Sequence, residues 1–362
     1  MLSTSDLTFI EKKGITAEMI DAQLKRFEVG FPFLKINAVA TIGNGIKAFS
    51  PEETAACVKA WSDFQQTGKA IEKFVPASGA ASRMFKNMFA FASSGKDAPT
   101  TDFEKEYFEN ITKFAFYADL NNACRKLYRS NVQELMSAGR YVDVVKAMLE
   151  PEGLNYGFLP KALLKFHKTT GGNAHTPLEE HLEEGAQYAA DKNRKVNLHF
   201  TVSPEHKAEF EKLLTAKLPI YEQVWGVKYN VTMSEQKSST DTIAVNMDNT
   251  PYREPNGELL FRPAGHGALI ENLNEREAAV VFIKNIDNVV PDRIKDETVL
   301  YKKLIAGVLV DTQKQVFDYL RELEAGVPSR EKLTEMLRFV ETTLCCKKAG
   351  AAELADAELA EA

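Results

Sequence analysis

IEKFVPASGAASRMFK, residues 71–86, is the stretch that best indicates the fold. Its first six residues form a mostly apolar run that predicts a short buried strand. ASGAAS (77–82) predicts a tight turn, and we expect a helix from about Ser82 to Phe91. Small residues in such a turn let backbone N–H groups approach a phosphate, and the helix N-terminus adds a favourable dipole. A tight turn with no ligand is the alternative that this segment alone leaves open.

Similar runs recur along the chain on the C-terminal side of this segment. Further strands are predicted at VNLHFTV (196–202), VKYNVTM (227–233), TIAVNM (242–247), ELLFRP (258–263) and AAVVFIKNI (278–286). Helices are predicted at residues 16–29, 50–66, 101–150, 176–190 and 298–348. Strands separated by helices predict an α/β protein with a mixed, mostly parallel sheet that helices flank on both faces.

The same pattern predicts the division of the chain. We expect an N-terminal helical region (1–70), an α/β core (71–296) with a helical insertion at about 92–155, a helical C-terminal extension (297–348) and an Ala/Glu-rich disordered tail (349–362). No internal repeat accompanies these regions.

Composition narrows the classes of function. The 362 residues carry a net charge of −6, which argues against a general nucleic-acid or anionic-membrane surface. The four cysteines form no CxxC pair, which is typical of a reducing compartment and not of a zinc or disulfide scaffold. We see no basic-apolar leader and no apolar run of about 18 residues. We therefore expect a cytoplasmic protein that binds neither nucleic acid nor membrane.

Two segments offer positive charge for a phosphate. Arg83, at the predicted start of a helix, could hold phosphate oxygens with both arms of its guanidinium. Lys161, in LPKALLK (159–165), could neutralise a phosphate as a point charge, although a plain surface lysine is the commoner outcome.

Two further segments follow predicted strands. Gly265 and Gly267 flank His266 in FRPAGHGALIENL (261–273), where the backbone could contact a base or ribose; a strand–turn–helix without a ligand is the alternative. Asp287 follows the apolar strand 278–286, and the carboxyl ends of parallel strands are where α/β folds bind ligands. Its carboxylate suits Mg²⁺, and a turn-forming aspartate is the alternative.

Together these segments resemble, in order, the nucleotide-sugar pyrophosphorylases, especially their UDP-sugar group, whose core is a GT-A-like Rossmann-type fold. ASGAASRM (77–84) is similar to the AGGxGTRM of that family, with Gly79, Arg83 and Met84 matching and Ser78 and Ala81 replacing glycines. Pro160, Lys161, Leu163 and TPLEEH (176–181) resemble its PKxL and PxLEH elements. Gln236, RPAGHG (262–267) and Ile286-Asp287-Asn288 resemble its Gln, GHG and DN elements. PASGAASRMFK and FRPAGHGALIENLN also look like the uncharacterised DUF4301 branch known mainly from Bacteroidetes.

The resemblance implies a Mg²⁺-dependent nucleotidyltransferase that forms a nucleoside-diphosphate sugar, with UTP favoured as the nucleoside triphosphate, and pyrophosphate from a sugar 1-phosphate. The loop that would cradle the triphosphate comprises Ala77, Ser78, Gly79, Ala80, Ala81 and Ser82. The resemblance places Arg83 on the leaving pyrophosphate, Lys161 on phosphate charge and Asp287 on Mg²⁺. It assigns Gln236 and Gly265 to the base, and His266, beside Gly267, to the ribose or α-phosphate.

The chain departs from the family after about Asp296, where the sequence is helical and the strands of a sugar-binding half are missing. A catalytically inactive nucleotide or nucleotide-sugar binding protein is therefore the alternative function. A GT-A-like glycosyltransferase is a third, although Asp241 and Asp248 form no DxD motif.

The remaining histidines and acids receive a plainer interpretation. His167, His175, His181, His199 and His206 lack a consistent ligand spacing, so we expect surface or hydrogen-bonded interior histidines. Glu179, Glu180, Glu183 and Glu184 are expected to form a solvated helix face.

Overall fold

The structure is a computed structural model that describes residues 2–36, 38–79, 81 and 83–362. Ala80 and Ser82, two residues of the expected phosphate loop, lie outside the described residues. The chain forms two compact units. Unit 1 comprises Met1–Lys47 and Gln65–Val299, and unit 2 comprises Ala48–Phe64 and Leu300–Ala362.

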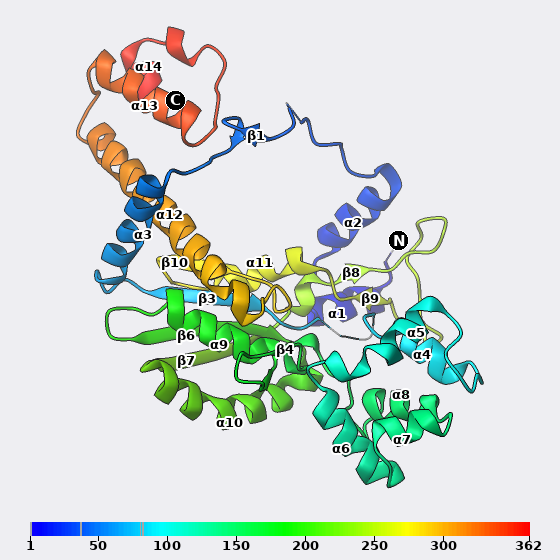
Figure 1. The fold of residues 1–362 in the computed structure, drawn as a ribbon. Coiled ribbons are helices and arrows are strands. Elements are labelled where there is room, and N and C mark those ends of the chain that lie inside the picture. Colours follow the sequence, from blue (N-terminus) through cyan, green and yellow to red (C-terminus); the bar gives the residue numbers. More distant parts are fainter. Residues whose placement is uncertain (1, 37, 80, 82) are drawn as a thin grey trace. The chain divides into compact units, whose positions relative to one another are not determined.

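A four-stranded parallel sheet forms the centre of unit 1 (Figure 1). Its strands are β3 (Ile71–Pro76), β6 (Lys195–Val202), β7 (Lys228–Glu235) and β10 (Val280–Ile283), in the order β10-β3-β6-β7. Every residue of β3 is buried, as expected for a central strand. The chain moves from β3 to β6 and β7 in one direction and then returns to place β10 on the other side of β3.

Helices flank the sheet on both faces. On one face, α9 (Pro177–Tyr188) and α10 (Lys207–Trp225) share a core with alternate residues of β6. On the other face, Asn272 of α11 (Ile270–Asn274) donates hydrogen bonds to the Ser234 hydroxyl and the Glu235 carbonyl, each 2.8 Å long. The prediction of a mixed α/β protein with a parallel sheet flanked by helices is confirmed.

A helical insertion separates β3 from β6. It contains α4 (Lys86–Ser93), α5 (Asp102–Glu109), α6 (Tyr117–Tyr128), α7 (Val132–Ser137) and α8 (Tyr141–Leu149), which share a hydrophobic cluster of their own. Capping boxes at Thr101 and Asn131 begin α5 and α7. The helix expected from Ser82 begins at Lys86 instead, because the Met84 N–H closes a turn onto the Ala81 carbonyl.

Short elements complete unit 1. They are α1 (Thr4–Lys12), α2 (Ala17–Val29), β1 (Thr41–Ile42), β2 (Gly45–Ile46), β4 (His167–Lys168), β5 (Ala174–His175), β8 (Thr242–Ile243) and β9 (Phe261–Arg262). The strands expected at 242–247 and 258–263 are reduced to the antiparallel pair β8–β9, which packs with Ile10, Ile15 and Ile20.

Unit 2 is helical. It contains most of α3 (Pro51–Gln65) and of α12 (Lys295–Glu324), then α13 (Arg330–Thr342) and α14 (Asp356–Glu361). Residues 48–64, which we assigned to an N-terminal region, group with the C-terminal helices. Residues 349–362, which we expected to be disordered, include α14, where Leu359 packs with Leu333 and Met336. None of the described helices has both the length and the apolar character that crossing a membrane requires.

Candidate functional site

The residues expected to bind a ligand follow the carboxyl ends of the parallel strands. Ala77, Ser78 and Gly79 follow β3, Gln236 follows β7, and Asp287 lies four residues after β10. The chain adds β6 and β7 on one side of β3 and β10 on the other, so the direction in which strands are added reverses between β3 and β10. In open α/β sheets, ligands bind at such a switch point, because connections on its two sides leave toward opposite faces.

Three of the four sequence segments meet at this switch point. The Lys161 ammonium forms an ion pair with the Asp287 carboxylate at 2.5 Å, and both side chains are about one-third exposed. The Lys161 backbone N–H donates to the Gly79 carbonyl at 3.2 Å. The Ile286 N–H donates to the Pro76 carbonyl, also at 3.2 Å. Backbone contacts therefore hold the turn after β3, the lysine segment and the segment after β10 together.

The remaining segment, FRPAGHGALIENL (261–273), forms a second group with Gln236, which also follows the carboxyl end of a strand. With its amide oriented to satisfy both ends, Gln236 donates to the Ala264 carbonyl and accepts from the Ala264 N–H, each at 3.1 Å. These bonds position the turn that contains Gly265 and Gly267. At both glycines, and at Gly79, a Cβ would meet no described atom within 4 Å, so the backbone there is accessible to a ligand.

Among the described residues, no contact tests the roles expected for two further site residues. Arg83 is exposed and lies in the turn before α4. His266 opens the 3-10 helix η5 (His266–Leu269), but its side chain lies outside what the structure describes. The assignments of Arg83 to the pyrophosphate and of His266 to the ribose therefore stay predictions.

The acidic helix differs most from expectation. Glu179, Glu180 and Glu184 of α9 are at most 1% exposed, so the prediction of a solvated face is wrong for these three. The Glu184 carboxylate accepts from Lys73 at 2.9 Å and from Lys284 at 2.5 Å. Lysines embedded in or just after β3 and β10 thus make burial of the helix acids possible, since buried charges require partners.

This buried charge network extends to the switch point through His181. Burial, with the nearby Lys73 ammonium, lowers the pKa of His181 well below its ordinary value. The neutral ring then has one N–H, and its Nε2 lies 3.2 Å from the Ile286 carbonyl, which can accept it. Burial alone would raise the pKa of Glu184, but the Lys73 and Lys284 ammonium groups act together against it, and this pKa lies below its usual range. Glu184 is therefore ionised, three residues after His181 on α9.

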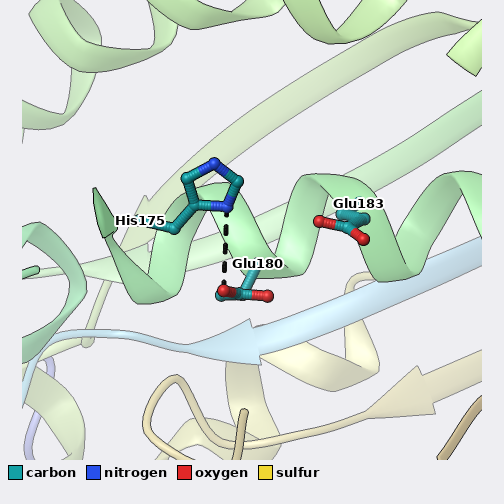
Figure 2. A group of neighbouring side chains, drawn as sticks. All are labelled: His175, Glu180 and Glu183. Carbon is teal, nitrogen blue, oxygen red and sulfur yellow. Dashed lines mark ion pairs between the residues drawn. The ribbon is translucent and has the colours of Figure 1, made fainter. Parts of the chain in front are cut away.

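A second acidic cluster lies at the N-terminal part of α9. Figure 2 shows His175, Glu180 and Glu183, whose potential ligand atoms lie within 4.8 Å of one another. The Lys295 ammonium contacts Glu180 at 2.7 Å, Glu183 at 3.0 Å and Asp292 at 2.9 Å. Although burial opposes it, hydrogen bonds to Glu180 and Asp292 raise the pKa of Lys295 above its ordinary value. One ammonium group therefore already occupies this cluster and offsets part of its negative charge.

Sequence reasoning missed both charge clusters, although one signal was present. The acids recur one helical turn apart on α9, while Lys73 and Lys284 interrupt apolar strands. A lysine inside a buried strand requires a buried acid, and α9 is rich in acids at helical spacing.

The fold and the arrangement at its edge define an α/β protein with a doubly wound parallel sheet and polar residues gathered at the switch point. The chain belongs to the family described as a domain of unknown function, DUF4301, whose model matches residues 3–361. No curated protein and no solved structure matches it.

Proposed function

We propose that the protein is a Mg²⁺-dependent nucleotidyltransferase that joins a nucleoside triphosphate, with UTP favoured, to a sugar 1-phosphate and releases pyrophosphate. The observation that carries this proposal is the contact of Gly79, Lys161 and Asp287 at the switch point. These residues come from three distant segments and have the chemistry that a triphosphate requires: an open backbone turn, a cation and a carboxylate.

The reaction requires positioning and charge neutralisation more than it requires a proton-transfer residue. The turn after β3 would hold the phosphates through its N–H groups, and Arg83 would neutralise the leaving pyrophosphate. Gln236 would position the turn at Gly265 and Gly267 for contact with the base and ribose.

The Asp287 carboxylate suits Mg²⁺, which takes one or two protein carboxylates together with substrate phosphates. Bound there, Mg²⁺ would supply positive charge to the phosphate oxygens. Lys161, which now pairs with Asp287, would be released to contact a phosphate itself. The strand order β7-β6-β3-β10, with all strands parallel, supports a GT-A-like core as part of the same proposal.

A catalytically inactive nucleotide-binding protein is the second candidate. The observation that favours it is the path of the chain after β10, which continues into the 30-residue helix α12. The pyrophosphorylases that the sequence resembles would continue there with strands for the sugar.

The test is calorimetric titration with UTP, ATP, GTP and CTP, each with Mg²⁺. We expect saturable binding of one triphosphate, weakened at least about tenfold in Arg83→Ala because a phosphate contact is lost. Arg338→Ala, which removes an exposed arginine from α13, is the matched control and should bind as the parent does.

A screen for released pyrophosphate across sugar 1-phosphates separates the two candidates. Release supports the transferase, and binding without release for every sugar supports the inactive protein. Equal affinity in Arg83→Ala and the parent would remove Arg83 from the site, and failure of all four triphosphates to bind would overturn both candidates.

A further inference from the structure

A large pocket lies between the helical insertion and the segment that follows Lys161. Its volume is about 680 Å³, which is in the range of small-molecule sites. The nonpolar part of its lining includes Met84, Phe85, Met88, Phe114, Phe116 and Leu164. Phe85, Met88 and Leu164 are buried and belong to the hydrophobic cluster of the insertion.

Most polar groups around the pocket already have partners. The Lys165 ammonium pairs with Asp119 at 2.7 Å, and the Tyr107 hydroxyl donates to the Met148 sulfur at 3.1 Å. The Asn110 amide donates to the Glu106 carbonyl and accepts from Lys113. The side chains of Glu106 and His167 also line the pocket, and a sugar with several free hydroxyls would find few other groups here to replace its bonds to water. A nonpolar group would find aromatic rings and two methionines, which adapt to irregular shapes.

The pocket adjoins the candidate site along the backbone. Met84 at the pocket directly follows Arg83. Leu164 at the pocket ends the 3-10 turn η2 (Lys161–Leu163) that begins with Lys161. Three residues of a 3-10 turn advance the chain by roughly 6 Å. The phosphate-binding groups and the pocket lining therefore lie within three residues of each other along the chain, a separation that one molecule would have to span.

We propose that this pocket receives the nonpolar part of the second substrate, an inference that rests on the proposed function. The second substrate is then a phosphate ester that carries a bulky nonpolar group, such as an acylated sugar 1-phosphate. The insertion would bind this part of the substrate, as the sugar-binding half does in the pyrophosphorylases.

The experiment compares 1-naphthyl phosphate with glucose 1-phosphate by calorimetric titration of the full chain. We expect 1-naphthyl phosphate to bind at least tenfold more tightly. Two variants change exposed lining residues at the rim of the pocket. Met84→Trp places an indole at a 46% exposed position, and Phe103→Ala removes a 45% exposed ring. Each should weaken 1-naphthyl phosphate at least tenfold, whereas Ile220→Trp, at a 54% exposed position on α10, should not.

The pocket assignment is overturned if glucose 1-phosphate binds as tightly as 1-naphthyl phosphate, or if both rim variants bind the probe as the parent does. UTP titrations of the same variants keep this outcome apart from the proposed function. UTP binding without probe binding refutes the pocket alone. Probe binding that the rim variants lose, without binding of any triphosphate, supports the pocket and refutes the transferase.

Discussion

Glu184 shows how a single residue joins the elements around the candidate site. It lies on α9, is fully buried, and its two carboxylate oxygens contact Lys73 of β3 and Lys284 after β10. The Tyr188 hydroxyl donates to the same carboxylate at 3.1 Å. One side chain therefore connects a helix to both strands that border the switch point.

Replacing Glu184 by alanine should lower the free energy of unfolding by about 3–5 kcal/mol, because two lysine ammonium groups would lose a buried counter-charge. Urea denaturation followed by circular dichroism measures the change. Glu211→Ala, at an exposed position of α10, is the control and should change stability by less than about 0.5 kcal/mol. A loss below about 1 kcal/mol in Glu184→Ala would mean that water or another acid replaces the carboxylate.

His199 makes stability depend on pH. It is 2% exposed, and its ring nitrogens lie 2.7 Å from the Thr232 hydroxyl and 2.8 Å from the Ser234 hydroxyl. Burial, with a smaller effect of the Arg276 guanidinium, lowers the pKa of His199 to about 4. Between this value and the ordinary histidine pKa of about 6.5, the unfolded chain binds a proton that the folded chain does not.

We therefore expect the His199 contribution to stability to fall as the pH drops from about 6.5 to 4, by a total on the order of 3 kcal/mol. His199→Gln should make the unfolding free energy less steep over this pH range, as measured by denaturation at several pH values. His206→Gln is the control, because His206 is half-buried in the 3-10 turn η3 (Pro204–His206). Identical slopes for the parent and His199→Gln would show that His199 titrates normally.

At the scale of elements, the pairing of α3 and α12 in unit 2 depends on a glycine. Gly307 lies in the interior of α12, where glycine costs about 1 kcal/mol relative to alanine. A Cβ at this position would overlap the Cys57 carbonyl oxygen of α3. The absence of a side chain thus permits the two helix backbones to approach closely.

Gly307→Ala should lower the free energy of unfolding by about 1–3 kcal/mol despite the better helix propensity of alanine, because the two helices must separate. Urea denaturation gives the value. Gly171→Ala is the control, since a Cβ there meets only the Thr169 hydroxyl, at 3.8 Å. Increased stability in Gly307→Ala would indicate that α3 shifts without cost.

Some elements could be predicted from the sequence and others could not. The strand at 71–76 and the helix that Thr176 caps depend on local signals, an apolar run and a capping box, and the structure contains both. The lengths of the strands expected at 242–247 and 258–263 were overestimated, because local apolarity does not reveal how far a partner strand continues. The burial of Glu180 and Glu184 was missed because their lysine partners lie far away in the sequence.

At the scale of the whole molecule, the α/β class was predictable, because alternating strands and helices allow few other arrangements. The grouping of residues 48–64 with the C-terminal helices was not, since no local pattern indicates a contact as distant as that of Cys57 with Gly307. For the site, the expected residues Gly79, Lys161 and Asp287 do meet. The aromatic pocket could not be foreseen, because its lining combines the insertion with residues that follow Lys161.

The parallel topology also has a consequence for synthesis of the chain. The Asn197 side chain donates to the Ile71 carbonyl across 126 residues, and Arg276 pairs with Glu72 across 204. At translation rates of about 5–20 residues per second, β3 leaves the ribosome roughly 6–25 s before β6 is available. The insertion lies within this interval, and its hydrophobic cluster extends from Ala81 only to Leu164. We therefore expect the insertion to fold first on the nascent chain, while the central strand of the sheet still has no neighbour.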